Sequence, residues 1–337
     1  MAVDFVIAWV DGADTAWQQV RARYQNEAEH KTSSDGENRY RDWGLLRYWF
    51  RGVEAFAPWV NHIYFVTWGH VPKWLSTAHP KLTVVRHEDY IPADYLPTFN
   101  ANTIELNFHR IAGLSEQFVY FNDDVFLLRP VRETDFFVDK KPKDLLALQP
   151  VIANRADAVM PYIYLNNAMT LAKYFDKREN AKKQPQAYFH PGYPPLYFFY
   201  NLLEMAFPMF TGFYTVHGPA AFLKQTYAAV WEKEGDLLDA VCRHRFRSRA
   251  DLNQYLLREW QMLAGQFVPA NVRRFCPYFD VQDQNGRLLQ LIRGQKRAAV
   301  CINDAKPVTD IAGVRRQLQD AFAAVLPDKS TFERADV

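Results

Sequence analysis

The first half of the chain alternates short apolar runs with longer amphipathic segments, and this alternation constrains the fold more than any other feature of the sequence. We predict strands at residues 3–10, 62–68, 81–87 and 117–128, and helices at residues 15–29, 42–57 and 102–114. Strands that alternate with helices form βαβ units and a mostly parallel sheet. The sequence therefore predicts an α/β fold.

The alternation ends near residue 150. Residues 188–218 are dense in Tyr, Phe and Pro and do not suggest one regular element. Beyond them we predict helices at residues 219–235, 250–265 and 314–326, and a strand at residues 297–303. We divide the chain into a region 1–150 and a mixed, mainly helical region 151–337, and expect the two to pack as one domain.

Composition limits the class of protein. The net charge of +2 over 337 residues gives no electrostatic case for nucleic-acid binding. Three scattered cysteines, Cys242, Cys276 and Cys301, fit a reducing compartment and argue against a disulfide framework or a zinc site. No signal-peptide pattern opens the chain and no apolar stretch approaches the length of a membrane span. We expect a cytoplasmic protein, which could still lie on a membrane surface.

An acidic turn follows the first predicted strand. Nucleotide-binding α/β domains place their ligand at the carboxyl end of this strand, but the glycine-rich phosphate loop is absent here. Gly12 permits close backbone approach, while Asp11 and Asp14 offer oxygen acceptors suited to a base, a ribose or a metal-bound water. Asp14 also fits the N-cap of the next helix, and both interpretations can hold.

Two further strands are followed or interrupted by acidic residues. Asp123 and Asp124 interrupt the run of β-formers at 117–128, and such charges are costly unless they are paired or metal-bound. The residues alone fit a Mg²⁺ or Mn²⁺ site and a turn that caps backbone donors equally well. Since successive strand residues face opposite ways, we expect only one of the two to face a given site. Asn303 and Asp304 end the strand at 297–303 in the same way.

Without a glycine loop, a bound diphosphate needs arginine, lysine or metal for charge compensation. Arg39, Arg41 and Arg47 lie beside Asp42 directly after a polar loop at 31–38, although a solvated helix start with Asp42 near its cap also explains Arg41. They are candidate phosphate-binding residues.

Two histidines are candidates for chemistry. Glu105 and His109 are one helical turn apart, which favours either a local ion pair or an edge that faces a site. His217 precedes an expected helix start at Pro219, where its ring could reach a site near the helix N-terminus and act as a general base.

These blocks, in this order, resemble the Stealth proteins, bacterial capsular-polysaccharide sugar-phosphotransferases related to the catalytic subunit of the lysosomal-enzyme GlcNAc-1-phosphotransferase. The four motif regions of that family are matched by residues 4–17, 38–127, 216–254 and 300–305. The second block is long and specific.

The resemblance implies a GT-A-like, Rossmann-related fold with a mostly parallel sheet flanked by helices, in which region 1–150 binds a nucleotide sugar and a helical, aromatic-rich C-terminal half completes the site. It implies transfer of a sugar-1-phosphate from a UDP-sugar to a hydroxyl of an acceptor glycan or lipid-linked oligosaccharide, with Mg²⁺ or Mn²⁺ as cofactor. Peripheral association with a membrane or with a capsule complex is compatible with such a role.

Carried over position by position, the resemblance places a set of residues in the family motifs, and our mechanistic hypothesis gives them three kinds of role. The catalytic residues are His217 as general base, Asp124, Arg39 and Arg247. The substrate-binding residues are Asp11, Gly12, Asp14, Asp42, Arg47, Asn102, Glu105, His109 and Arg110. The metal ligands are Asp123, Asp124, Asn303 and Asp304.

The chain departs from the family pattern at three positions. Trp43 and Leu45 replace the Asn and Glu of the common form "DNGELR", and Trp68 replaces a polar residue. A carboxylate role at position 45 is therefore in doubt, and the tryptophans indicate a different sugar pocket.

Two rival functions remain open. One is a GT-A glycosyltransferase that releases UDP. The other is a non-catalytic glycan-binding or scaffold protein of capsule assembly.

Overall fold

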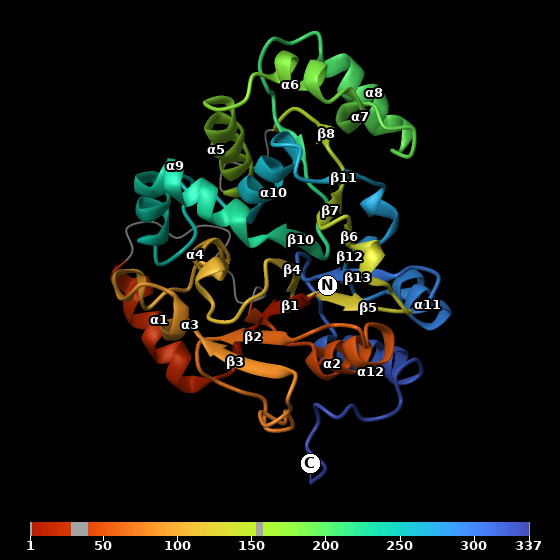
Figure 1. The fold of residues 1–337 in the computed structure, drawn as a ribbon. Coiled ribbons are helices and arrows are strands. Elements are labelled where there is room, and N and C mark those ends of the chain that lie inside the picture. Colours follow the sequence, from red (N-terminus) through yellow and green to blue (C-terminus); the bar gives the residue numbers. More distant parts are fainter. Residues whose placement is uncertain (1, 28–39, 153–157, 337) are drawn as a thin grey trace.

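A five-stranded sheet forms the centre of the protein (Figure 1). The computed structural model describes residues 2–27, 40–152 and 158–336. In spatial order the strands are β10 (Ala220–Leu223), β4 (Gln117–Asn122), β1 (Val3–Ala8), β2 (Ile63–Thr67) and β3 (Leu82–Arg86). Strands β4, β1, β2 and β3 are parallel, and β10 pairs antiparallel with β4. The predicted α/β class with a mostly parallel sheet is confirmed.

Helices cover both faces of the sheet, which explains why its strands are nearly continuous apolar runs. The helices are α1 (Thr15–Glu27), α2 (Leu46–Phe56), α3 (His87–Tyr90), α4 (Ala101–Leu106), α5 (Met160–Ala172), α6 (Lys177–Lys183), α7 (Pro185–Tyr188), α8 (Pro195–Glu204), α9 (Lys224–Cys242), α10 (Gln254–Leu263), α11 (Gly286–Gly294) and α12 (Ile311–Ala323). Phe5 and Ile7 of β1 pack in one core cluster with α2 and α12. Val6 packs in a second cluster with α9 and α10. One strand thus supplies two cores through its alternating side chains.

Three smaller sheets extend the fold. The first consists of β12 (Tyr278–Asp280), β13 (Ala299–Asn303) and β5 (Val125–Leu127), the second of β11 (Val268–Pro269), β7 (Lys141–Asp144) and β6 (Phe137–Val138), and the third of β8 (Ala147–Leu148) and β9 (Phe213–Tyr214). Short 3₁₀ helices form at Ala93–Tyr95, Phe108–Arg110, Glu133–Asp135 and Val272–Arg274. Strand β5 follows β4 directly but belongs to a different sheet, so the chain changes sheets at Asp123 and Asp124.

The prediction of a helix at 219–235 is wrong at its start. Residues 220–223 form β10, all four side chains are buried, and α9 begins only at Lys224. The edge of β4 accepts these residues as an antiparallel partner, which a short Ala-Ala-Phe-Leu run permits as readily as a helix. His217 therefore precedes a strand and not a helix N-terminus.

Two other predicted elements are shorter than expected. The helix at 102–114 ends at Leu106, because the side chain of Asn107 donates back to the carbonyl of Thr103 at 2.8 Å and a 3₁₀ turn follows. The strand at 117–128 divides into β4 and β5 around a tight turn. Residues 188–218 do not form one regular element, as predicted: they contain α8 and, separately, the short strand β9.

All three cysteines are free and buried. Among the described residues, no helix is both long enough and apolar enough to cross a bilayer.

Candidate active site

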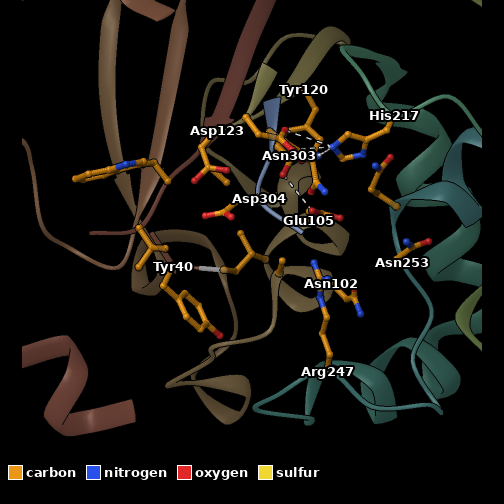
Figure 2. Close-up of a pocket in the computed structure, with 18 of the residues that line it drawn as sticks. Tyr40, Asn102, Glu105, Tyr120, Asp123, His217, Arg247, Asn253, Asn303 and Asp304 are labelled. Atoms are coloured by element: carbon orange, nitrogen blue, oxygen red, sulfur yellow. Dashed lines mark hydrogen bonds and ion pairs between the residues drawn. The ribbon is translucent and has the colours of Figure 1, made fainter. Parts of the chain in front are cut away.

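A cavity of about 790 Å³ opens at the carboxyl ends of β1 and β4 (Figure 2). Its walls come from segments far apart in the chain: the loop before α2, helices α4, α5 and α10, the segment before β10, and the end of β13. The predicted site residues Asp42, Asn102, Glu105, Asp123, Asp124, His217, Arg247, Asn303 and Asp304 all line it. Segments separated by almost 300 residues thus contribute to one cavity.

Asp123 and Asp124 form the tight turn that joins β4 to β5. The expectation that only one of them faces a given site is wrong, because both line the cavity from a turn and not from a strand. Strand β13 pairs with β5, and the backbone N–H of Ile302 donates to the carbonyl of Asp124 at 2.8 Å. This pairing brings Asp304 to the same wall, and Figure 2 shows Asp123 and Asp304 pointing toward the same part of the cavity.

His217 lies between a carboxylate and a phenol. Its Nε2 lies 3.3 Å from Oδ2 of Asp124 and 3.1 Å from Nδ2 of Asn122, and its Nδ1 lies 3.1 Å from the hydroxyl of Tyr255. Burial lowers the pKa of His217, but the charges of Asp124 and Glu105 outweigh it, so the pKa is raised above 6.5. Burial alone would raise the pKa of Asp124, yet the contact with His217 holds it below its usual value.

Helix α10 fixes the backbone that carries His217. Arg258 donates from Nη1 to the carbonyl of Val216 at 2.7 Å and forms a buried ion pair with Asp144 of β7. Glu259 accepts from the hydroxyl of Thr215 at 2.7 Å. Together with Tyr255, three residues of one helix therefore hold three consecutive residues that end in His217.

The cavity carries an excess of negative charge. Among the residues that the structure describes, its walls contain five carboxylates, of Asp42, Glu105, Asp123, Asp124 and Asp304, against the guanidinium groups of Arg41 and Arg247 and the imidazole of His217. Desolvation and the charges of Asp124 and Asp42 raise the pKa of Asp123 to about 7. Desolvation likewise raises the pKa of Glu105 to about 7, and it raises the pKa values of Asp42 and Asp304. The site therefore favours the arrival of positive charge.

Arg247 lies in the loop between α9 and α10, and the carboxylate of Asp251 organises this loop. The fully buried Asp251 accepts hydrogen bonds from Nδ2 of Asn100 and of Asn102, both at 2.9 Å. It also accepts from Nδ1 of His244 at 2.6 Å and from the backbone N–H of Ser248 at 3.0 Å. One carboxylate thus joins the Arg247 loop to the start of α4.

Replacing Asp251 by Ala is expected to lower the free energy of unfolding by about 3 kcal/mol or more, because several buried donors lose their acceptor together. It should also lower kcat by about ten- to a hundredfold, since Arg247 and Asn102 lose their positions. Thermal unfolding and steady-state kinetics measure the two effects. Asp236→Ala on the exposed face of α9 is the matched control. Unchanged stability and kcat in Asp251→Ala would contradict the positioning role.

Several predicted site residues lie outside the cavity lining. His109 and Arg110 turn away from it: the ring of His109 lies 5.6 Å from that of Tyr227, and Arg110 lies over the ring of Trp231. No ion pair joins Glu105 and His109, because the helix ends between them; Glu105 lines the cavity and accepts from the hydroxyl of Tyr120, whereas His109 does not line it. Arg47 lies over the ring of Trp74.

The acidic turn after β1 is stabilised by its own side chains. Oδ1 of Asp11 accepts from the N–H of Ala13 at 2.9 Å, and Oδ1 of Asp14 accepts from the N–H of Trp17 at 3.0 Å, which confirms Asp14 as a cap. A Cβ atom on Gly12 would lie 2.0 Å from the carbonyl oxygen of Tyr40, so only glycine allows Tyr40 to approach.

None of the three acidic-turn residues lines the cavity, although Trp9 and Val10 before them do. Arg39 lies outside the described residues.

The residues that sequence reasoning missed are mostly partners of the predicted ones. Tyr255, Asn122, Asp251 and Arg258 orient His217 or the Arg247 loop. Asn122 was detectable, because it directly precedes the two aspartates. The others are polar residues in or before a predicted amphipathic helix, and nothing local distinguishes them. Trp43 and Leu45, which depart from the family pattern, both line the cavity.

Comparison with known proteins identifies similar chains over nearly the whole length. A family model described as "Stealth protein CR2, conserved region 2" matches residues 39–145. The chain is 39% identical to the capsular polysaccharide phosphotransferase WcwK of Streptococcus pneumoniae, over 98% of this chain and 99% of that protein. It is 39% identical to the receptor polysaccharide phosphotransferase WefC of Streptococcus gordonii, over 98% of each chain.

Two further proteins are more distant. The exopolysaccharide phosphotransferase cps2G of Lactiplantibacillus plantarum is 36% identical, over 98% of this chain and 96% of that protein. Among solved structures, the galactosyltransferase LgtC in complex with donor and acceptor sugar analogues has a TM-score of 0.38 and 12% identity, over 97% of this chain and 98% of that one. A structural similarity this low carries no information about the reaction.

Proposed function

The chain belongs to the Stealth family of capsular and exopolysaccharide phosphotransferases, and from this premise we propose that it transfers a sugar-1-phosphate from a UDP-sugar to a hydroxyl of an acceptor glycan. In the proposed reaction the acceptor oxygen bonds to the phosphorus that carries the sugar. The bond from that phosphorus to the bridging oxygen breaks, UMP leaves and a phosphodiester forms. The acceptor proton passes to the protein.

The single observation that carries the proposal is the pairing of His217 with Asp124 in a cavity rich in carboxylates. An attacking hydroxyl needs a base, and the neighbouring carboxylate stabilises the imidazolium that forms. A diphosphate adds further negative charge to a cavity whose carboxylates already repel one another. The site therefore suits this substrate only together with a cation.

The residues present fit a divalent metal ion. Asp123 lines the cavity, and desolvation together with the charges of Asp124 and Asp42 raises its pKa to about 7, so a cation beside it would favour the ionised carboxylate. We propose Asp123 and Asp304 as ligands of Mg²⁺ or Mn²⁺, with the amide oxygen of Asn303 beside them. When bound, such an ion would offset the charge of the two phosphates and stabilise the leaving UMP.

Asp124 has a different proposed role. Asp124, His217 and Cys301 bring three potential ligand atoms within 4.8 Å of one another, a set that would suit zinc better than magnesium. However, burial and the Asp124 charge raise the pKa of the Cys301 thiol far above its usual value, which disfavours the thiolate that zinc needs. We therefore assign Asp124 to His217.

The partners of His217 indicate how it can hold a proton. In the neutral ring, Nδ1–H can donate to the oxygen of Tyr255, and Nε2 can accept from the amide of Asn122. After taking the acceptor proton on Nε2, the ring can donate to Asp124. Each protonation state thus has partners in place, so the proton transfer needs little reorganisation.

The two arginines of the cavity are proposed to act on the phosphates. Arg247 extends toward the centre of the cavity near Asn102 (Figure 2), and its charge lowers the pKa of Glu105. Arg41 lies 3.2 Å from Oδ2 of Asp304 and lines the same wall. Phosphoryl transfer depends mainly on positioning and on charge stabilisation, which these groups can supply. Arg39, next to Arg41 in sequence, remains a candidate for the same role.

We place the nucleoside end of the donor against the aromatic wall at the carboxyl end of β1. Trp9, Trp17, Tyr40 and Trp43 line this side of the cavity, and aromatic faces stack on bases. The proposed part of Asp11, Gly12 and Asp14 is to hold the turn that presents this wall. Tyr164, Tyr255 and Tyr278, which also line the cavity, are left for the acceptor glycan.

Nucleotide analysis tests the proposed function. Incubation with a panel of UDP-sugars, acceptor glycans and Mg²⁺, with chromatography that resolves UMP from UDP, should show UMP that depends on acceptor and metal. Release of UDP would favour a glycosyltransferase, which the same cavity could house. Glycan binding without any nucleotide product would favour the scaffold alternative.

The pH dependence tests the base. The charges of Asp124 and Glu105 raise the pKa of His217, and the charge of Arg258 in α10 lowers it. The neighbouring phenols of Tyr255 and Tyr278 stay protonated, because their own pKa values are raised. Because the neutral ring is the reactive form, kcat/KM should rise with pH and level off only above a pKa higher than 6.5. In Glu105→Gln this limb should move to lower pH. A profile that is flat from pH 5.5 to 8 would contradict the assignment.

A further inference from the structure

Helix α8 carries polar side chains toward the protein and apolar side chains toward solvent. Five large apolar side chains of α8, and Phe207 just after it, are 38–58% exposed. The five are Leu196, Phe198, Phe199, Leu202 and Leu203. The inner face consists of Tyr197, Asn201 and Glu204, all buried. This distribution is the reverse of an ordinary surface helix, which packs its apolar stripe inward.

The buried polar side chains of Asn201 and Glu204 on the inner face are hydrogen-bonded to the rest of the protein, and these bonds hold the helix in this orientation. Oδ1 of Asn201 accepts from the N–H of Leu148 at 2.7 Å, and Nδ2 donates to the carbonyls of Leu146 and Tyr188. Glu204 accepts from the hydroxyl of Thr211 at 2.7 Å. The apolar outer face is therefore a stable surface of the fold, and such a surface marks an interaction site.

Basic residues adjoin this surface. Helix α6 is joined to the end of α8 by Lys177, whose ammonium group donates to the carbonyl of Glu204 at 2.7 Å. Arg178, Lys182 and Lys183 of α6 are exposed, as are the acids Asp176 and Glu179, and Lys182 forms an ion pair with Glu179 at 2.7 Å. From residue 158 to residue 212 the chain has five basic and three acidic residues, and between 195 and 212 the one acidic residue is the buried Glu204. The surface is thus apolar with a cationic margin.

Helix α5 stands at the same end of the molecule as α6 and α8 (Figure 1). It exposes Tyr162, Leu165 and Met169, while Met160 and Tyr164 line the cavity. Exposed apolar side chains are therefore not confined to α8 but recur on a second helix at this end, one whose other face contributes to the active site.

We propose that α8, together with the basic residues of α6, binds the surface of a lipid bilayer that contains anionic headgroups. The outer face of α8 carries Phe and Leu and no exposed acid, and the adjoining helix α6 exposes three basic residues against the acids Asp176 and Glu179. An apolar face beside an excess of basic residues is typical of helices that lie in the membrane interface. The apolar side chains enter the boundary of the acyl chains, and the lysines reach the headgroups. None of the described helices is long and apolar enough to cross a bilayer, and the proposal concerns only the outer face of α8 with its basic neighbours. This inference is independent of the proposed reaction.

Vesicle flotation tests the proposal with the purified full chain. The wild type should float with vesicles of phosphatidylcholine and phosphatidylglycerol, and less with phosphatidylcholine alone. The triple variant Leu196→Ser, Phe199→Ser and Leu203→Ser should lose at least about tenfold in partitioning. Lys182→Glu with Lys183→Glu should remove the preference for anionic vesicles. Ile311→Ser, at an exposed apolar position of α12, is the matched control and should float like the wild type.

Folding is checked by thermal unfolding, and activity toward a water-soluble acceptor should be unchanged in all these variants. Failure of the wild type to float with anionic vesicles would overturn the proposal, as would undiminished flotation of the triple variant. A concentration-dependent dimer that the triple variant disperses, without vesicle binding, would assign the surface to a second copy of the chain and would also overturn it.

Discussion

Replacing His217 by Gln is expected to lower kcat by about 10²–10⁴-fold while KM for the donor changes little. The amide can preserve part of the hydrogen bonding to Tyr255 and Asn122, but it cannot take the acceptor proton. Since the ring lies between Asp124 and Tyr255 and has no proposed contact with the nucleoside, donor binding should persist. Single-turnover kinetics and calorimetric titration of the donor separate the two effects.

The matched control for this variant is His62→Gln. His62 directly precedes β2, forms a hydrogen bond with the hydroxyl of Thr83 in β3 and does not line the cavity. It should keep wild-type kcat. Turnover of His217→Gln within a few-fold of the wild type would remove His217 from the role of base. A common loss of donor binding and kcat would point to a folding or binding role instead.

Replacing Asp123 by Asn is expected to lower kcat by about 10²-fold or more in the presence of Mg²⁺, because the charge stabilisation that a metal supplies is worth several kcal/mol. The same substitution should not lower the thermal stability of the metal-free protein at pH 8, and it can raise it. The folded-state pKa of Asp123 is raised to about 7 from the ordinary 3.8, so its stabilising protonated form is lost as pH rises through 7. Without metal at pH 8, Asp123→Asn should therefore unfold at a temperature equal to or above that of the wild type.

Thermal unfolding with and without Mg²⁺ measures this pattern directly. The wild type should gain stability on addition of Mg²⁺ at pH 8, and Asp123→Asn should gain much less. Asp94→Asn, in an exposed ion pair with Arg243, is the control and should respond to metal like the wild type. A wild type that is fully active after chelation would contradict the metal proposal.

The parts of the fold that the sequence predicted well are those set by local pattern. The apolar run of β1, the cap formed by Asp14 and the acidic ends of β4 and β13 all depend on neighbouring residues. Because the carboxyl ends of parallel strands meet at one edge of a sheet, recognising those ends was sufficient to bring several candidate carboxylates into one site.

The misses have a common physical cause in long-range packing. Ala220–Leu223 becomes a strand only because β4 offers an unpaired edge, which no local signal announces. Helix α8 escaped detection because its buried face is polar, so its pattern does not resemble that of a packed surface helix. Tyr255 orients His217 across 38 positions of sequence. His109 was assigned to the site through the family resemblance, and its helical spacing from Glu105 does not hold because α4 ends at Leu106.

Transfer of the β-phosphorus is the central claim, and a donor labelled with ³²P at that position tests it most directly. We expect the label to appear in the acceptor glycan as a phosphodiester, with unlabelled UMP released, and we expect His217→Gln to slow both together. Label retained in released UDP while the sugar appears on the acceptor would contradict the account, because the reaction would then take place at the anomeric carbon.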